Sequence, residues 1–234
     1  MTTSPREHIV RSQDEEHQRL VGEILRMGSL ATAQLEAALA VAARPDGAAA
    51  ARIVAADAAI DALEREVSHD AMTLSLRGPL ARDLREVLSA LRIVSDLERI
   101  GDHAAGIAKR AAALDRAPPA PAADGFARLG ALALRQLRDV LAAYRARDAL
   151  AAQAVRDRDA GLDAEYTRLF RALLAGMTGD PDSVAAGTWL LFMAKDLERI
   201  GDHATNIAEN VWFMVRGDDP LPPREKADRT SQAG

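Results

Sequence analysis

The sequence predicts an all-α protein built as two tandem, pseudo-symmetric three-helix bundles with six long helices. The composition supports helices, because the 234-residue chain is 48% hydrophobic but only 3% aromatic and is rich in Ala, Leu, Arg and Glu. Apolar residues recur at the three- and four-residue spacing of amphipathic helices. The string Asp-Leu-Glu-Arg-Ile-Gly-Asp-His-Ala occurs at 96–104 and again at 196–204, which indicates a repeat of about 100 residues.

The first half of the chain, residues 14–115, is predicted to hold three helices. Apolar or small residues from Leu20 to Ala38 mark the first helix, and Arg-Pro-Asp-Gly at 44–47 ends it. A second helix, marked by Ile53 and its successors, runs to the Arg-Gly-Pro sequence at 77–79. The first and third helices are predicted at 14–43 and 80–114, and residues 1–13 are predicted to be a flexible N-terminus.

A proline-rich segment, residues 116–125, separates the two halves. Because it holds three of the ten prolines, it is predicted to be a non-helical, semi-rigid linker. The helical pattern then restarts over the second half, residues 126–216, with a break at Gly-Asp-Pro, 179–181. Its helices are predicted at 126–147, 150–177 and 183–215, and residues 217–234 are predicted to be a flexible C-terminal tail.

Charge and cysteine content exclude several classes of function. The net charge is −5 and the basic residues are spread along the chain, so nucleic acid is not an expected partner. The absence of cysteine excludes disulfides, thiolate metal sites and thiol catalysis. The first residues form no signal-peptide core, and no stretch is long and apolar enough for a membrane span. We therefore expect a cytoplasmic protein.

The candidate functional residues are carboxylates that occur in pairs four residues apart, a spacing that places both on one face of a helix. If each helical hairpin folds back about its turn, the two pairs of a half meet at the same level. In the first half these residues are Asp57, Asp61, Glu98 and Asp102, and in the second half they are Asp159, Asp163, Glu198 and Asp202.

Four carboxylates gathered in this way repel one another unless something neutralises them. Two unit charges 4 Å apart repel by ~1 kcal/mol in water and by ~4 kcal/mol near a protein surface. Bound metal ions would remove this repulsion, and oxygen ligands suit Mg²⁺, Ca²⁺, Mn²⁺ or iron. Neutralisation by Arg99 and Arg199 in a salt-bridge lattice is the alternative, and in that case the acidic band is purely structural.

Two further residue types recur in both copies of the repeated string. Gly101 and Gly201 fall in mid-helix, where each costs ~1 kcal/mol relative to Ala, so we expect a neighbouring backbone to approach closely there. His103 and His203 point about 100° away from the acidic pairs. We expect the histidines to lie at the surface or to support the sites, and not to be metal ligands.

The two copies of the string, the continuation Thr205-Asn206-Ile207-Ala208-Glu209 and the upstream aspartate pairs make residues 14–216 resemble the PhoU family. The resemblance implies three-helix bundles, often dimeric, in which the eight carboxylates bind clusters of divalent or trivalent metal ions such as Mg, Mn, Fe or Zn. The first copy departs from the pattern at Ala105-Gly106-Ile107, so the two halves need not bind metal equally.

The resemblance also implies a function and partners. Members are non-enzymatic negative regulators of the phosphate-starvation response. They link a phosphate ABC transporter, through its ATPase subunit, to a sensor histidine kinase, and they reach the membrane only through these partners. A carboxylate-bridged metalloenzyme, either an oxidase or a phosphoester hydrolase, is the alternative from another class. This alternative has less support, because the chain lacks the paired Glu-x-x-His motifs of di-iron bundles.

Overall fold

The structure, a computed structural model, describes residues 5–76, 81–114, 120–217, 219 and 221. In this part of the chain it contains seven α-helices, one short 3-10 helix and no strand, so the all-α prediction is confirmed. The elements are α1 (Pro5–Ala43), α2 (Gly47–Ser75), α3 (Ala81–Ala112), α4 (Ala120–Ala146), α5 (Ala149–Asp157), α6 (Asp159–Gly179), η1 (Pro181–Ser183) and α7 (Val184–Arg216).

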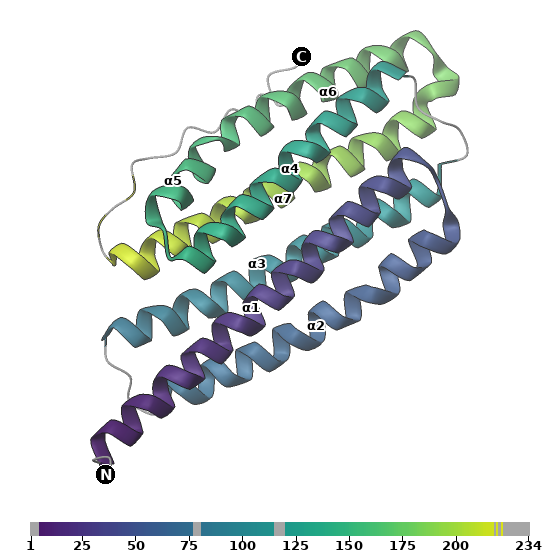
Figure 1. Ribbon diagram of the computed structural model, residues 1–234. Coiled ribbons are helices and arrows are strands. Elements are labelled where there is room, and N and C mark those ends of the chain that lie inside the picture. Colours follow the sequence, from purple (N-terminus) through teal and green to yellow (C-terminus); the bar gives the residue numbers. More distant parts are fainter. Residues whose placement is uncertain (1–4, 77–80, 115–119, 218, 220, 222–234) are drawn as a thin grey trace.

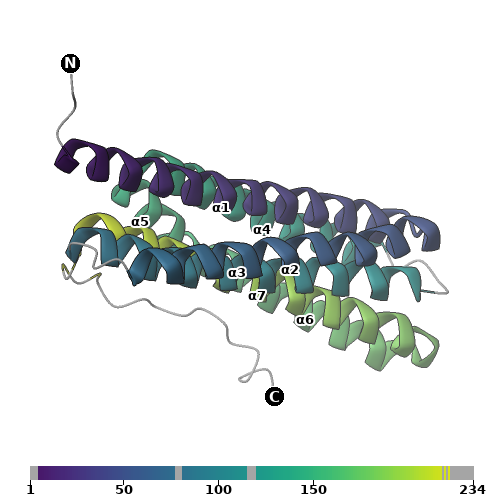
Figure 2. The same ribbon diagram turned by 90° about the horizontal axis from the view of Figure 1, so that it is seen from below.

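The helices form two three-helix units that lie side by side, as predicted (Figure 1). The first unit consists of α1, α2 and α3, and in the second α5 and α6 together take the place of α2. The units meet where α3 packs along α7 and α1 packs along α4, so α2 and α6 lie at opposite outer edges. Figure 2 shows α1 and α4 in one layer, with α3 and α7 in the layer beneath.

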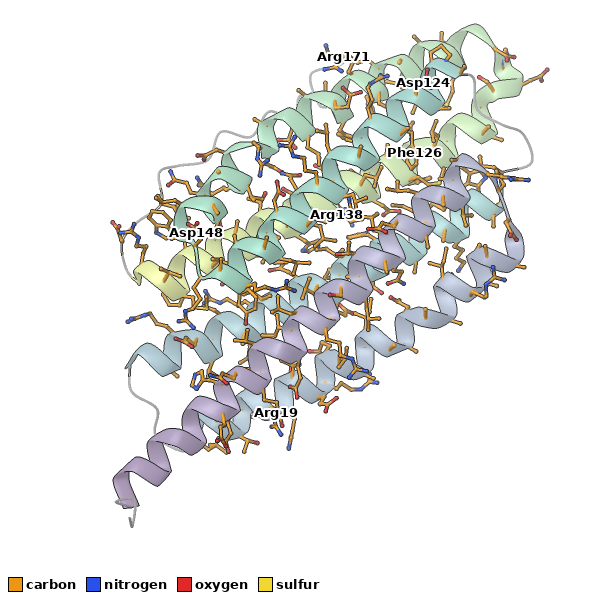
Figure 3. The ribbon with its side chains drawn as sticks, viewed as in Figure 1. Arg19, Asp124, Phe126, Arg138, Asp148 and Arg171 are labelled. Carbon is orange, nitrogen blue, oxygen red and sulfur yellow. The ribbon has the colours of Figure 1, made fainter. Side chains whose placement is uncertain are left out.

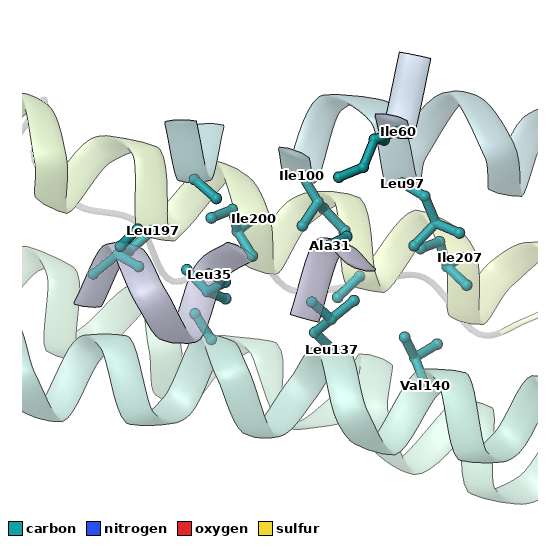
Figure 4. Close-up of a cluster of buried hydrophobic side chains, with 14 of the residues drawn as sticks. Ala31, Leu35, Ile60, Leu97, Ile100, Leu137, Val140, Leu197, Ile200 and Ile207 are labelled. Carbon is teal, nitrogen blue, oxygen red and sulfur yellow. The ribbon is translucent and has the colours of Figure 1, made fainter. Parts of the chain in front are cut away.

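The two units share one hydrophobic core. Its centre is formed by fully buried side chains from the four inner helices, α1, α3, α4 and α7, joined by Ile60 of α2 (Figure 4). Burial of such aliphatic side chains is the main favourable contribution to folding, at roughly 1.5–3 kcal/mol for each. The two halves therefore contribute to a single continuous core. The central residues include Leu35, Leu97, Ile100, Leu137, Leu197 and Ile200.

Pseudo-symmetry is visible where α1 crosses α4. Gly28 of α1 faces Leu141 of α4, and Gly130 of α4 faces Leu39 of α1, so closely that a Cβ at either glycine would collide with the opposing leucine. Residue numbers rise along one helix as they fall along the other, so the two helices are antiparallel. The same pair of contacts in exchanged roles indicates a twofold relation between the halves.

Helix ends differ from the predicted boundaries in two places. The first helix begins at Pro5 and thus includes much of the segment 1–13 that we predicted to be a flexible terminus. The second half begins with α4 at Ala120, so residues 120–125 of the predicted linker are helical. Pro121 lies in the first turn, where the missing N–H costs no intrahelical hydrogen bond. The break at 77–79 and residues 116–119 lie outside the described residues.

Aspartates at equivalent positions start the second helix of each unit. Asp46 accepts hydrogen bonds from the amides of Ala48 and Ala49, at 2.9 and 3.0 Å. Asp148, labelled in Figure 3, likewise accepts from the amides of residues 150 and 151, both at 3.0 Å. Both caps satisfy N–H groups that have no partner within the helix. None of the described helices is both long and apolar enough to cross a membrane.

The helix predicted at 150–177 is in fact interrupted, because α5 ends at Asp157 and α6 begins at Asp159. At the junction the amide of Arg158 bonds the carbonyl of Val155, three residues back, at 3.2 Å. The first half has alanines at 55 and 59 where the second has Asp157 and Gly161, which are weaker helix formers. This difference in helix propensity explains why α2 is continuous and its counterpart is not.

Candidate metal sites on paired helices

The carboxylates predicted in the first half come together between α2 and α3. We call Asp57, Asp61, Glu98 and Asp102 the first acidic cluster. Burial raises the pKa of Asp57, and the negative charges of Asp102 and Asp61 raise it further, against a hydrogen bond from Gln34 that lowers it. Charge is therefore concentrated here at an energetic cost.

Glu98 extends the cluster towards a fifth carboxylate. Burial and the charge of Asp102 raise the pKa of Glu98, and the charges of Asp61 and Glu64 of α2 add to this. Arg99 opposes the shift: its Nε lies 3.1 Å from a Glu98 oxygen, and its Nη1 donates to Asp102 at 2.9 Å. The arginine neutralisation that is the alternative to metal ions is therefore present in part, on a guanidinium whose side chain is 56% exposed.

Gln34 of α1 closes the inner side of the first acidic cluster. Its Nε2 donates to Asp57 Oδ1 at 3.0 Å and to the carbonyl of Ile53 at 3.3 Å, while its Oε1 is buried without a hydrogen-bond partner. Gly101 makes this arrangement possible, because a Cβ there would lie 2.9 Å from Ile60 Cδ1 and 3.0 Å from Asp57 Oδ1. The atoms that approach Gly101 belong to side chains, so the prediction that a neighbouring backbone approaches there is wrong.

We call the four carboxylates predicted in the second half, Asp159, Asp163, Glu198 and Asp202, the second acidic cluster; they lie on α6 and α7, two helices that pack together. It is more deeply buried than the first: Asp159, Asp163 and Glu198 are only 1%, 3% and 5% exposed. Gln136 of α4 repeats the role of Gln34, donating to Asp159 Oδ1 at 3.2 Å and leaving a buried Oε1 without a partner. Burial of three carboxylates requires compensation, because an isolated charge is costly away from water.

Lys195 pairs with a carboxylate of the second cluster, as Arg99 pairs with carboxylates of the first. Lys195 Nζ lies 2.8 Å from Glu198 Oε2 and 5.2 Å from the centre of the Tyr166 ring, a cation–π distance. Tyr166 stands at the position of Glu64 in the first half, so the second cluster has one carboxylate fewer nearby. Arg199, the arginine that the salt-bridge alternative assigned to this cluster, is exposed. The two clusters thus share a plan but differ in charge and burial.

The donor chemistry of both clusters suits hard cations, since the ligands available are carboxylate and amide oxygens. As the side chains stand, no three acids or histidines among the described residues are arranged as a ready-made metal site. Arg99 and Lys195 occupy part of the space that a cation would take. Metal binding would therefore require these two flexible side chains to swing outward.

The histidines of the repeated string lie between the halves, at a seam that the sequence did not predict. The rings of His103 and His203 stack with centroids 5.7 Å apart. His103 Nδ1 lies 3.1 Å from Asp196, and His203 Nδ1 lies 2.8 Å from Asp96, so each copy of the string supplies the partner of the other. Arg110 adds a 2.6 Å hydrogen bond to Asp196.

The repeated string itself contains the residues that could have predicted this contact between the halves. A string that carries both Asp and His seven residues apart can pair with a second, antiparallel copy of itself. The sequence placed the histidines about 100° from the acidic pairs, but the expectation that they lie at the surface or support the sites did not include this contact between the halves. The seam (His103, His203, Asp96 and Asp196) therefore joins α3 to α7, while each of these helices turns its acidic pair outward towards α2 or α6.

Comparisons with known proteins place this architecture in a family. A PhoU domain model matches the chain twice, at residues 24–111 and 126–211. The chain is 57% identical over 231 residues to the phosphate-specific transport system accessory protein PhoU homolog of Xylella fastidiosa, covering 99% of this chain and 98% of that protein. It is 45% identical to the homolog of Caulobacter vibrioides, covering 97% and 99%.

Solved structures agree. PhoU from Pseudomonas aeruginosa superposes with a TM-score of 0.84 at 32% identity, covering 87% of this chain and 99% of that one. The phosphate transport system regulatory protein PhoU from Streptococcus pneumoniae gives a TM-score of 0.82 at 32% identity, covering 88% and 98%. The chain therefore belongs to the PhoU family, a family of non-enzymatic accessory and regulatory proteins.

Proposed function

We propose that this protein is an accessory and negative regulatory component of a phosphate transport system. It acts as a cytoplasmic adaptor that links the ATPase subunit of a phosphate ABC transporter to a sensor histidine kinase and limits phosphate uptake. The observation that carries the proposal is the match over nearly the whole length of a phosphate-specific transport system accessory protein, which leaves no large segment unaccounted for in either chain.

The two acidic clusters are proposed to bind divalent or trivalent cations. Three features support this: carboxylates of the first cluster that repel one another, pKa values of Asp57 and Glu98 raised by burial and neighbouring charge, and buried amide oxygens of Gln34 and Gln136 that lack partners. A bound cation would supply the positive charge that these oxygens need. The proposed ligands are Asp57, Asp61, Glu98 and Asp102 in the first cluster, and Asp159, Asp163, Glu198 and Asp202 in the second.

The clusters flank the seam, and this placement suggests how they serve an adaptor. α3 and α7 each carry one acidic pair on the outer side and one Asp and His pair on the seam side. Neutralised clusters fix α2 against α3 and α6 against α7, and the seam fixes the two units against each other. The outcome is a rigid surface for the transporter and kinase. A homodimer would present this surface twice.

Capture of partners tests the role of the clusters. The purified ATPase subunit and the kinase's cytoplasmic part are passed over immobilised wild type and over a Glu98→Gln/Asp102→Asn/Glu198→Gln/Asp202→Asn variant, each with and without chelator. We expect capture by the wild type only without chelator, and no capture by the variant. Amide substitutions keep the side-chain volumes and remove only the charge.

A matched control removes four acids that are exposed and lie outside the clusters: Glu36→Gln, Glu66→Gln, Asp157→Asn and Asp182→Asn. This variant has the same net charge as the cluster variant and should capture both partners normally. Equal capture by all three proteins, with or without chelator, would rule out a metal-dependent docking surface. A carboxylate-bridged oxidase or hydrolase gains no support from the comparisons, because the family is non-enzymatic.

A further inference from the structure

An open groove runs between α1 and α2, on the first unit only. Its volume is about 870 Å³, and its floor is apolar. It extends along residues 30–41 of α1, roughly 16 Å at 1.5 Å per residue, or three helical turns. The residues that shape it are Leu30, Ala33 and Ala37 of α1 and Ile53, Ala56 and Ile60 of α2.

The second unit has the same groove in a closed form, which makes an internal comparison possible. A cavity of only about 40 Å³ remains there, lined by Leu132, Gln136 and Leu162. These residues are the counterparts, 102 positions on, of Leu30, Gln34 and Ile60. The repeat thus preserves the groove's framework, and a difference in a few other side chains must account for the difference in volume.

Three charged residues, Arg135, Asp139 and Arg158, distinguish the second unit here, and both arginines line its small cavity. Arg158 Nη2 donates to Asp139 at 2.7 Å, and Arg135 Nε lies 3.7 Å from the same carboxylate. The first unit has alanine at all three equivalent positions, namely Ala33 for Arg135, Ala37 for Asp139 and Ala56 for Arg158. The open groove is therefore a specific departure from the pattern of the repeat, because the chain itself contains the set of residues that closes it.

The rim of the open groove is basic. Arg44 and Arg52 line it at the α1–α2 turn together with Asp46, and the charges of both arginines lower the pKa of that carboxyl. Asp46 also caps α2, and the rim therefore carries two positive charges against one negative charge. The counterparts of the two arginines in the second unit are Ala146 and Ala154. Positive charge thus accompanies the open groove and is missing from the closed one.

We infer that the α1–α2 groove is a docking site for an amphipathic helix of another protein, with carboxylates flanking the helix's apolar face. Alanines along the floor allow a helix to approach closely, at the 8–10 Å that separates packed helix axes. Helices usually bind such grooves through apolar side chains at the three- and four-residue spacing of one helix face. The flanking carboxylates would pair with Arg44 and Arg52.

A second copy of this chain fits the groove less well. A twofold contact places the same patch of both copies against itself, which would bring the two arginine rims to one interface. Like charges facing each other at an interface oppose association. The inference concerns a face formed by α1 and α2 and does not depend on metal binding by the acidic clusters.

Two synthetic probe helices of about 20 residues test the inference, a length at which an amphipathic peptide can form a helix when bound. Both carry the same Leu and Ala face, but one has Glu along its flanks and the other Lys. Fluorescence anisotropy should show the acidic helix binding the wild type at least ten times more tightly than the basic one. An Arg44→Glu/Arg52→Glu variant, altered only at exposed positions, should reverse this preference.

A second experiment places the charged residues of the second unit at the equivalent positions of the open groove. The Ala33→Arg/Ala37→Asp/Ala56→Arg variant should lose binding of the acidic helix. A control variant, Ala55→Arg/Ala59→Asp/Ala62→Arg, places the same residues on the exposed face of α2 and should bind normally. Equal binding of both helices, or unchanged binding after the transplant, would overturn the inference. So would a wild-type dimer that the transplant converts to a monomer, since the occupant would then be a second copy.

Discussion

The charge state of Asp57 provides a sharp test of the first acidic cluster. Replacing Asp57 with Asn should stabilise the protein when no cation is present. The substitution removes a charge whose pKa is raised by burial and by the repulsion of Asp102 and Asp61. The Asn oxygen can still accept the 3.0 Å hydrogen bond from Gln34 Nε2. Loss of a buried, repelled charge with retention of its hydrogen bond should therefore favour the folded state.

The size of the effect follows from the number and exposure of the neighbours. A like charge as close as ~4 Å would contribute between ~1 kcal/mol in water and ~4 kcal/mol near a protein surface, and more distant charges would contribute less. Asp57 is half-buried, and solvent screening and the lost charge on its hydrogen bond to Gln34 reduce the sum, so we expect a net gain of about 1 kcal/mol. For a chain of this length this corresponds to a rise in Tm of roughly 2–4 °C.

A cation should reverse the order of stability. At a hundredfold excess over Kd a bound ion stabilises the wild type by ~2.7 kcal/mol, whereas a variant whose affinity is a hundred times weaker gains only ~0.4 kcal/mol. Thermal unfolding in EDTA and in excess Mn²⁺ should thus show Asp57→Asn above the wild type in the first condition and below it in the second. An exposed control, Asp157→Asn, should not cross over. A variant less stable than the wild type in EDTA would refute the repulsion argument.

Three further predictions concern pH, packing and the seam. In EDTA the difference in unfolding free energy between wild type and Asp57→Asn should shrink as pH falls from 7 towards 3.8. The reason is that a carboxyl whose pKa is raised in the folded state destabilises the protein only while it is ionised. Urea titrations at several pH values measure this difference, and a constant difference would contradict the prediction. Gly201→Ala should destabilise the folded protein by about 1 kcal/mol, because the new Cβ would lie 2.9 Å from buried Leu162. Gly22 faces open space, so Gly22→Ala should stabilise the protein by up to ~1 kcal/mol in the same urea assay. Asp196→Ala should cost about 2 kcal/mol in chemical denaturation, since it breaks two hydrogen bonds across the seam, and a loss below 0.5 kcal/mol would show that the seam contributes little.

Much of the architecture could be predicted from the sequence because it depends on local rules. The four-residue spacing of Glu98 and Asp102, and its recurrence at Asp57 and Asp61, is enough to predict that these carboxylates lie on facing helices. The turns at 44–47 and 179–181 were recognisable from Pro and Gly. Whether the acids bind metal remains a prediction, because spacing brings oxygens together without determining what neutralises them.

The features that escaped prediction depend on contacts between distant segments or on small differences between the repeats. The histidine seam requires the antiparallel docking of α3 on α7, which the spacing within either helix does not specify. Lys195, which pairs with Glu198, lies just before the repeated string, at a position that is Ser95 in the first half. The repeat therefore does not predict this ion pair. The interruption at Arg158 depends on the helix propensities of only a few residues, and the general helical pattern continues across it.

Metal content tests the central claim most directly, namely that the two acidic clusters bind cations. Equilibrium dialysis against Mn²⁺, followed by elemental analysis, should find at least one ion per cluster in the wild type. A Glu98→Gln/Asp102→Asn variant should lose the share bound by the first cluster, and a Glu198→Gln/Asp202→Asn variant the share bound by the second. A wild type without Mn²⁺ above the buffer background, or metal content unchanged in both variants, would contradict the claim.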